Sequence, residues 1–329
     1  MNRRGHLLGC WMLLAGCSAQ GAGNGLAFRP PVIPQLAAHD DRPLSPPALI
    51  ATNVMTGGLL SWPTNERRRR HEPIHFAKGL DAYSYAIAAN ADMLVIPIYY
   101  GPGRVLMYNL KTKRSATLKD DYGIPYDVTI DTKGNIYALN QRSVTVYAAG
   151  SYSEKELSCD YPQLLDETIG VDNEGDVFVN ASLSGSNIGV VEYPAGTRKC
   201  KILNLPEQGY PGGIGVDPKT DDLIVIDNPD VCAGYMSASG EGRMRIYPRP
   251  YRPTKFTQVD LNPQYCAGVF RLDKDSKHIY VADQSDEYAS IIDARTYPAG
   301  EGHGFFSRPQ FGPYAEIGGF TTIPNGLPN

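Results

Sequence analysis

One short phrase recurs along the sequence, and this repeat limits the possible folds more than any other feature. The phrase is an apolar stretch, an aspartate, a polar turn and a second apolar stretch, as in GVDPKTDDLIVID at 215–227. Related copies are VTIDTKGNIYALN at 128–140, GVDNEGDVFVNA at 170–181 and RLDKDSKHIYVAD at 271–283. The polar residues favour a tight turn and the apolar residues favour strands, so each copy predicts a β-hairpin.

The spacing of the copies predicts how the hairpins assemble. The marker aspartates Asp131, Asp172, Asp217 and Asp273 are separated by 41, 45 and 56 residues. An earlier copy carries Ala89 in the marker position, 42 residues before Asp131. Periods of about 40–45 residues that contain only strands are typical of the blades of a β-propeller.

A second hairpin follows each copy, and its count sets the number of blades. Six such outer hairpins are marked by apolar third strands, at 59–63, 105–109, 144–148, 189–194, 244–248 and 291–295. Only five inner hairpins precede them, so we expect the carboxyl-terminal EIGGFTTIPN at 316–325 to pair near 49–63 and close the ring without an open edge. The sequence therefore predicts an all-β protein: a six-bladed β-propeller of four-stranded blades over residues 49–329, with almost no helix.

Three segments carry a resemblance to known propellers. HIYVAD at 278–283, DLIVID at 222–227 and VVEYPAG at 190–196 resemble the NHL repeat and its relatives, the gluconolactonase-like propellers of the senescence marker protein type. The likeness extends over about residues 83–300. It implies the propeller fold more strongly than any activity.

The residues that end the repeated phrase are the candidate metal ligands. Asn140, Asp227 and Asp283 take this place, and Asn180 stands one position before it. Because the second strand of each blade ends at one mouth of the central channel, we expect these four side chains around that mouth. Carboxylate and amide oxygens suit a hard divalent cation such as calcium, the one cofactor that this pattern indicates.

The family resemblance and the chemistry of turns give two interpretations of these residues. In the gluconolactonase-like family a glutamate, an asparagine and an aspartate hold a divalent ion at this mouth, and another aspartate serves as base. Asp227 and Asp283 match the strand-end aspartate, but the equivalent residue in the earliest blade is Pro97, and no glutamate ligand is evident. The alternative is that these side chains cap their own turns by accepting hydrogen bonds from backbone amides.

The amino terminus predicts export. Two arginines precede an apolar run at 7–15, a layout typical of a secretory signal and too short to span a bilayer. Leu14-Ala15-Gly16-Cys17 resembles the bacterial lipoprotein lipobox. The resemblance implies a signal peptide over 1–16, lipidation of Cys17 and a membrane anchor on the extracytoplasmic side of the bacterial cell envelope; the alternative is an ordinary cleaved signal with an incidental cysteine. Residues 17–48 are rich in Gly and Pro and predict a flexible tether.

Cysteine usage agrees with an oxidising compartment. Beyond Cys10 and Cys17, four cysteines remain, an even number that predicts two disulfides. Cys232 follows the strand that ends near Asp227, and Cys266 precedes the first strand of the next blade, so both are expected on one face of the ring. We therefore expect a Cys232–Cys266 bond and, by elimination, a Cys159–Cys200 bond.

Charge and loop composition lead to two functional hypotheses. A net charge of −4, with acids and bases interspersed, gives no reason to expect a nucleic-acid partner. The long loop at 227–242 offers aromatic and flexible polar residues at the mouth. The first hypothesis is a lipid-anchored binding module that presents this mouth to a protein, peptide or glycan; the second is a divalent-metal-dependent hydrolase or lyase of the gluconolactonase type.

Overall fold

The computed structural model describes eleven stretches of the chain, namely residues 48–53, 57–63, 74–77, 84–158, 163–184, 187–197, 199–228, 242–261, 266–284, 289–307 and 317–323. The predicted signal peptide, Cys17, the tether up to residue 47, Cys159, Cys232 and most of the 227–242 loop lie outside these residues. No helix occurs in the stretches that are described, and so none there is long and apolar enough to cross a membrane.

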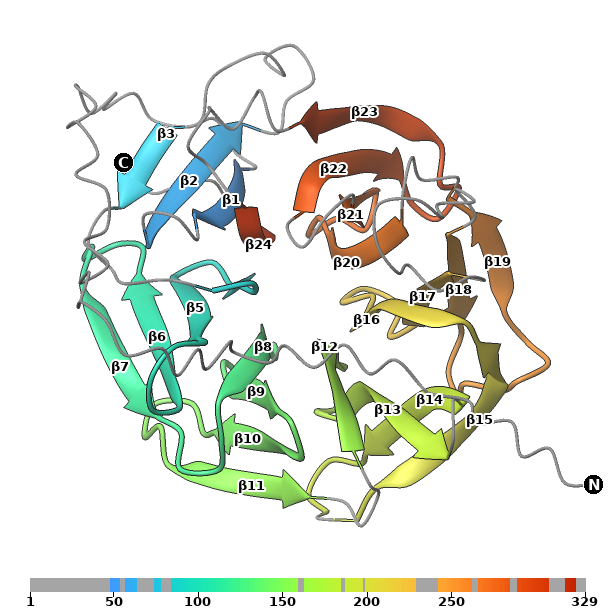
Figure 1. Cartoon of the computed structure of the whole chain (residues 1–329), viewed down its shortest axis with the longest axis horizontal. Helices are drawn as coiled ribbons and strands as arrows, with labels where there is room; N and C mark the ends of the chain where they lie inside the picture. The colour runs from blue at the N-terminus through green and yellow to red at the C-terminus, as the bar shows by residue number, and fades with distance from the viewer. Residues whose placement is uncertain are drawn as a thin grey trace, which may run out of the picture. The chain divides into compact units, whose positions relative to one another are not determined.

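Six four-stranded antiparallel sheets form the blades of a β-propeller, which confirms the predicted fold class (Figure 1). Blades 1 and 2 consist of β24 (Ile317–Ile323), β1 (Ala48–Asn53), β2 (Gly58–Pro63) and β3 (Ile74–Ala77), then β4 (Ala88–Ala89), β5 (Met93–Ile98), β6 (Arg104–Asn109) and β7 (Ser115–Lys119). Blades 3 and 4 consist of β8 (Pro125–Ile130), β9 (Ile136–Asn140), β10 (Ser143–Tyr147) and β11 (Glu154–Ser158), then β12 (Gln163–Val171), β13 (Val177–Ser184), β14 (Asn187–Tyr193) and β15 (Lys201–Gln208). Blades 5 and 6 consist of β16 (Tyr210–Val216), β17 (Leu223–Asn228), β18 (Arg243–Tyr247) and β19 (Thr257–Asp260), then β20 (Cys266–Leu272), β21 (His278–Gln284), β22 (Ala289–Thr296) and β23 (Gly302–Ser307).

The ring closes in the way the sequence predicts. Strand β24 from the carboxyl-terminal segment pairs antiparallel with β1, from Ala48 opposite Ile323 to Asn53 opposite Ile317. Blade 1 therefore takes its innermost strand from one end of the sequence and its other three from the opposite end (Figure 1). This pairing leaves no blade without its inner strand.

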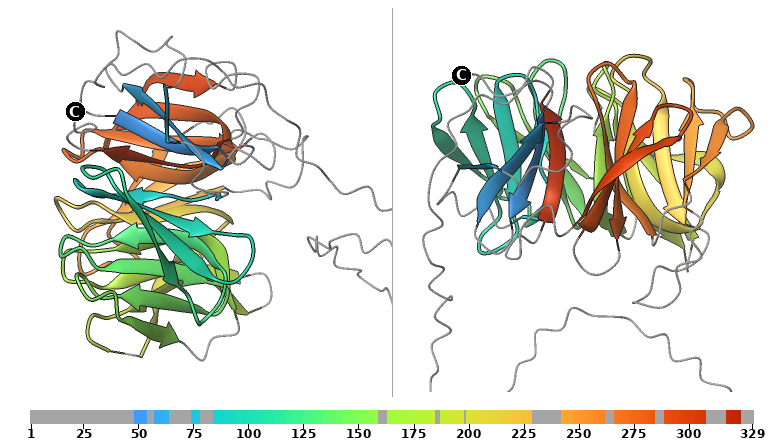
Figure 2. Two further views of the ribbon diagram at one scale, coloured as in Figure 1. Left: turned by 90° about the vertical axis from the view of Figure 1, so that its left-hand side faces the viewer. Right: turned by 90° about the horizontal axis from the view of Figure 1, so that it is seen from above.

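Strand direction gives the propeller two distinct ends, seen edge-on in Figure 2. In blades 2 to 6 the innermost strand runs towards a turn, and the second strand runs back, as β8 and β9 do from Ile130 opposite Ile136 to Pro125 opposite Asn140. We call the end with these turns the turn rim, and the end where the second strands finish the strand-end rim. In blades 2 to 6 the repeated phrase forms the innermost strand, the turn and the second strand, so it runs from the strand-end rim to the turn rim and back.

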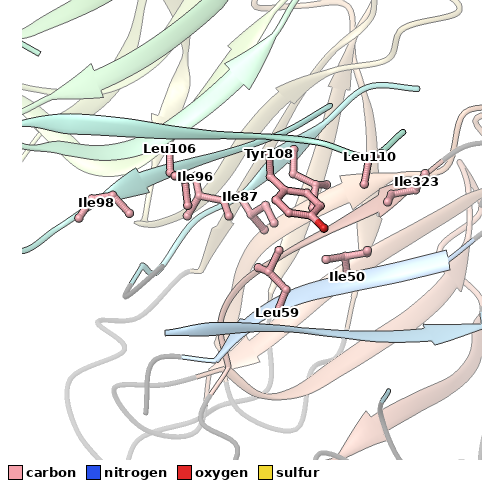
Figure 3. Packing of buried hydrophobic residues seen from close by; sticks show 10 residues of the cluster. Ile50, Leu59, Ile87, Ile96, Ile98, Leu106, Tyr108, Leu110 and Ile323 are labelled. Carbon is pink, nitrogen blue, oxygen red and sulfur yellow. The ribbon is translucent and has the colours of Figure 1, made fainter. Parts of the chain in front are cut away.

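Blade faces pack against one another to form the core. Figure 3 shows one such interface, in which Ile50 and Leu59 of blade 1 meet Ile87, Ile96 and Leu106 of blade 2. Second strands are covered on both sides, so every residue of β9 and of β17 is buried. Outermost strands such as β7 are mostly exposed and carry polar residues, which protects these edges from further pairing.

Candidate functional site

The marker aspartates of the repeated phrase have a structural role at the turn rim. Asp172 shows the pattern: its Oδ1 accepts hydrogen bonds from the backbone N–H groups of Glu174, Gly175 and Asp176 at 3.0, 2.9 and 2.8 Å. Equivalent bonds from turn amides are accepted by Asp131, Asp217 and Asp273. Turn capping, the alternative role for the strand-end residues, is thus performed by these aspartates, which lie at the turn rim, where the second strand begins.

Asn140 lies at the strand-end rim of blade 3 and is bonded within its own blade. Its Nδ2 donates to Thr145 Oγ1 at 2.8 Å and to Asp120 Oδ2 at 3.3 Å. Its Oδ1 is buried and accepts no hydrogen bond from any described residue. Asp120 also accepts bonds from Thr145 Oγ1 and from the N–H of Tyr122, so it fixes the loop that leads into β8.

Asn180 and Asp227 face each other's blades at the strand-end rim. On β13, Asn180 shares its face with Phe178, and on β17 Asp227 shares its face with Val225; Phe178 and Val225 belong to the same core cluster between blades 4 and 5. Both side chains are fully buried. The structure therefore brings these two predicted residues into one interface, whereas Asn140 belongs to another blade pair.

Asp227 is held mainly by arginines. One carboxylate oxygen, Oδ2, accepts the N–H of Gly209 at 2.8 Å and forms an ion pair with Arg243. Arg245 Nη1 lies 3.7 Å from the other oxygen, Oδ1, which accepts no hydrogen bond from the described residues. A cation at Asp227 would have to compete with these guanidinium groups.

Asn180 differs from Asp227 because both polar atoms of its side chain are buried and without a hydrogen-bond partner among the described residues. The same holds for the side-chain amide of Gln208, at the end of β15. Native proteins leave few buried polar groups unpaired, since each costs about 1–3 kcal/mol. Burying Asn180 is therefore costly, and no described residue of its own blade or of the neighbouring blade offsets that cost.

The remaining predicted site residues are described only in part. Asp283 lies on β21 opposite Ala267 and Ile291, but its side chain is not among the described ones. No group of three or more His, Cys, Asp or Glu side chains in the described stretches is arranged to hold a metal ion. The four-residue metal site stays a prediction.

The cysteine pairing also stays a prediction. Cys200 is disulfide-bonded, and its partner is not among the described side chains. Cys266 opens β20, next to Ala267, whose N–H and C=O bond the side chain of Asn228 at 3.0 and 2.9 Å. The Asn228 side chain, at the start of the loop that carries Cys232, thus contacts the backbone next to Cys266, and the Cys232–Cys266 bond itself stays a prediction.

An aromatic surface, which the sequence analysis did not locate, occupies the strand-end rim of blades 2 and 3. Tyr99 is at its centre, with ring centroids of Tyr85, Tyr100 and Tyr126 at 5.7, 5.4 and 5.5 Å in edge-to-face arrangements. Together with two neighbouring side chains these form what we call the tyrosine platform: Tyr85, Tyr99, Tyr100, Tyr122, Ile124 and Tyr126. Edge-to-face contacts stabilise aromatic pairs by about 0.5–1.5 kcal/mol beyond burial, so they fix the rings in place.

Three members of the tyrosine platform are strongly exposed. Tyr100, Tyr122 and Ile124 expose 58, 42 and 39% of their surface. They make up half of the six large apolar or aromatic side chains that the described part of the chain exposes to this degree. The exposed apolar surface is thus concentrated in one place, and such concentration marks interaction sites rather than ordinary surface.

Close backbone contact holds the two loops of the platform together. The loop after β5 meets the loop before β8 where Asp120 donates its N–H to the C=O of Gly103 at 2.8 Å. A Cβ atom at Gly103 would overlap the carbonyl oxygen of Gly123, so a glycine is required at this approach. The platform is therefore built on two mutually supported loops.

An ion pair crosses the central channel between the rims. Arg271, on β20 of blade 6, donates through Nη2 to Asp127 Oδ1 at 3.2 Å and to the C=O of Ile87 at 3.3 Å. Asp127 lies on β8 of blade 3 and accepts the N–H of Ile169, in blade 4, at 2.9 Å. Burial raises the pKa of the Asp127 carboxyl above its ordinary value, although the charge of Arg271 acts in the opposite direction. One pair of side chains thus links blades 2, 3, 4 and 6.

A cavity of about 370 Å³ lies in the channel on the turn-rim side of this ion pair. The ends of all six innermost strands line it, and Arg271 reaches it. Its apolar wall includes Ile130, Val171, Val216, Phe270 and Leu272. The sequence predicts a metal site at the strand-end mouth, whereas this cavity lies at the turn rim.

Comparisons with known proteins support the fold alone. No protein-family model matches the chain, and no curated protein matches it in sequence. A chain of a nidogen/laminin complex superposes with a TM-score of 0.63 at 14% identity, over 84% of this chain and 98% of that one. Hydrazine synthase of Kuenenia stuttgartiensis gives 0.50 at 10% identity over 73% and 70%, and a streptogramin B lyase gives 0.49 at 14% over 70% of each chain. The nidogen/laminin likeness supports the fold and no role, and the resemblance to NHL and gluconolactonase-like proteins stays a prediction.

Proposed function

We propose that this chain is an exported, lipid-anchored binding protein that recognises a protein, peptide or glycan through the strand-end rim. The observation that carries the proposal is the tyrosine platform, in which Tyr100, Tyr122 and Ile124 are exposed on two loops joined by the Asp120–Gly103 hydrogen bond. Tyrosine supplies a large contact area with few rotatable bonds and a hydroxyl for hydrogen bonding, and it is enriched where proteins bind partners. The nidogen/laminin likeness is compatible with this role but adds no more than the fold.

Site-specific photo-cross-linking tests this proposal and identifies the partner in the same experiment. A photoreactive residue in place of Tyr100 or Tyr122 should capture the same species in intact cells, identified by mass spectrometry. The matched control is Phe256, an aromatic residue of similar kind that is 36% exposed near the turn rim of blade 5. Equal capture from Phe256, or no capture from either platform position, would refute a binding role for the platform.

The anchor is the part of the proposal that the amino-terminal motif supports. Metabolic labelling with palmitate should tag the wild-type protein and not the Cys17→Ser variant, because Cys17 is the acyl acceptor in the lipobox pattern. Labelling that survives the substitution would remove the anchor from the proposal and leave the binding role standing.

A second candidate function is the divalent-metal-dependent hydrolase or lyase of the gluconolactonase type. It is favoured by one observation: Asn140, Asn180 and Asp227 each keep a buried side-chain oxygen that accepts no hydrogen bond from the described residues. Such oxygens are suitable ligands for a hard cation. Calcium and zinc titrations of the full chain and of Asp227→Ala discriminate between the two candidate functions. Saturable metal binding that depends on Asp227 supports the metal enzyme. No such binding would mean that the buried oxygens are not metal ligands.

A further inference from the structure

The cavity at the turn rim combines an apolar wall with an arginine at its floor. Arg271 is the one arginine among the residues that line it, and its side chain remains 17% exposed. Lys274, the other basic lining residue, lies in the turn after β20, at the mouth of the cavity. The partner of Arg271, Asp127, is buried and is not among the lining residues, so it lies behind the guanidinium as seen from the cavity. A ligand that enters from the turn rim therefore reaches the Arg271 guanidinium before the Asp127 carboxylate.

The acidic residues around the cavity are already engaged. Asp131, Asp172 and Asp273 line it, and each accepts hydrogen bonds from its own turn amides. Asp172 also forms an ion pair with Arg249, and Asp273 bonds His278 Nδ1 at 2.7 Å. The oxygens of these carboxylates are thus engaged by turn amides and by basic side chains. At the floor of the cavity lies Arg271, which is paired with Asp127 behind it.

Arg271 retains hydrogen-bonding capacity. A guanidinium group has five N–H donors. Within the described part of the chain it forms three hydrogen bonds, two through Nη2 and one from Nη1 to the C=O of Phe270 at 2.9 Å. One N–H on Nη1 and the N–H on Nε remain, and a charged N–H donor of this kind forms a strong hydrogen bond to a carboxylate oxygen.

The innermost strands add a second kind of recognition. Each of β4, β8, β12, β16, β20 and β24 has a hydrogen-bonded neighbour on one side only, so its other backbone edge faces the channel. Nearer the strand-end rim side chains occupy such edges, as Thr168 Oγ1 does by accepting the N–H of Ile214 at 2.5 Å. The lining of the cavity includes residues of all six innermost strands, of which β12 and β16 approach closely where a Cβ atom at Gly170 would meet the backbone of Gly215.

We propose that this cavity binds an apolar carboxylate, with the carboxylate on Arg271 at the floor and the apolar body between the innermost strands. Two sources share this chemistry: the carboxyl terminus of a peptide, whose backbone also matches the strand edges, and a short-chain aliphatic acid. The site is independent of the tyrosine platform, which lies at the opposite rim, so the failure of either proposal leaves the other intact.

Calorimetric titration of the full chain with matched probes tests the proposal. The probes are N-acetyl-leucyl-leucine and octanoate, each compared with its amide. We expect at least one carboxylate to bind, and its amide to bind at least tenfold more weakly, because only the carboxylate pairs with Arg271. The probe that binds identifies the source, and equal binding of acid and amide, or binding of neither acid, would overturn the proposal.

Two variants place the bound probe in the cavity. Arg271→Lys keeps the charge but lacks the remaining Nη1 and Nε donors, and should weaken binding of the acid about tenfold while the amide is unaffected. Val216→Phe, on the cavity wall, should abolish binding by filling the space, whereas Ile202→Phe on the exposed outer strand β15 should not. Circular dichroism and thermal melting establish that each variant is folded. Unchanged binding in Val216→Phe would show that the probe binds elsewhere.

Discussion

The two rims of the propeller differ in how regular they are. At the turn rim of blades 3 to 6, an aspartate follows the innermost strand and caps the turn by accepting hydrogen bonds from its amides. At the strand-end rim the blades differ: blade 3 has an Asn–Asp–Thr network, blade 4 has amides with no partner among the described residues, blade 5 has an Asp–Arg group, and tyrosines lie between blades 2 and 3. The repeated aspartates of the turn rim stabilise the fold. The residues of the strand-end rim, which differ between blades, are better suited to recognise a particular partner.

Breaking the Arg271–Asp127 ion pair, which lies in the channel between the two rims, should have the largest effect on stability. Asp127→Asn leaves the Arg271 guanidinium inside the channel without a counter-charge and places an amide N–H against the N–H of Ile169. We expect a loss of about 3–5 kcal/mol in the free energy of unfolding, measured by urea denaturation.

The matched control for this ion pair is the double variant Asp127→Leu with Arg271→Met. Replacing both charges by apolar side chains should cost far less than the single change, because no charge is then buried unpaired. If the double variant is as unstable as Asp127→Asn, the pair contributes through the blades it links rather than through its charges.

The disulfide expected at the strand-end rim ranks next. Removing the Cys232–Cys266 bond by the double change to Ser should lower the free energy of unfolding by about 3–4 kcal/mol, because the bond closes a loop of 34 residues in the unfolded chain. Peptide mapping without reduction checks the connectivity directly. A linkage of Cys159 to Cys232, or unoxidised thiols at 232 and 266, would contradict the pairing and leave the blade register to be explained.

The capping aspartates of the turn rim should have an intermediate effect. Asp172→Ala removes the acceptor of three turn amides and the partner of Arg249, and we expect a loss of about 2 kcal/mol by thermal or urea unfolding. Asp121→Ala is the control at the other rim, because the Asp121–Lys119 pair is exposed and solvent screening should make its loss much smaller than that of Asp172. Equal losses for the two changes would mean that the turn aspartates do not stabilise the regular rim.

The same contrast explains what could be predicted from the sequence. Periodic features, namely the blade number, the hairpins and the closure by residues 316–325, follow from local patterns and were all confirmed. The tyrosine platform joins Tyr85, Tyr99 and Tyr126 from three separate segments, and the abundance of tyrosine did not indicate where they meet. Arg271 opens one copy of the repeated phrase, yet its partners Asp127 and Ile87 lie 144 and 184 residues away, on blades that only the closed ring brings near. The pattern predicts that the ring closes, but it does not indicate which side chains of distant blades then meet across the channel.

The smallest predicted effect, and the only gain in stability, concerns Asn180. Both polar atoms of its buried side chain lack a partner among the described residues, so Asn180→Leu should raise the free energy of unfolding by about 1 kcal/mol, measured by urea denaturation with calcium chelated. Asn140→Leu is the matched control at the same rim of blade 3, and it should destabilise instead, because Asn140 donates to Thr145 and Asp120. With calcium added, a metal site that includes Asn180 predicts that the wild type gains stability and Asn180→Leu does not. If Asn180→Leu is destabilising even in chelator, Asn180 has a structural partner that the described residues do not include, and its unpaired amide is no sign of a ligand.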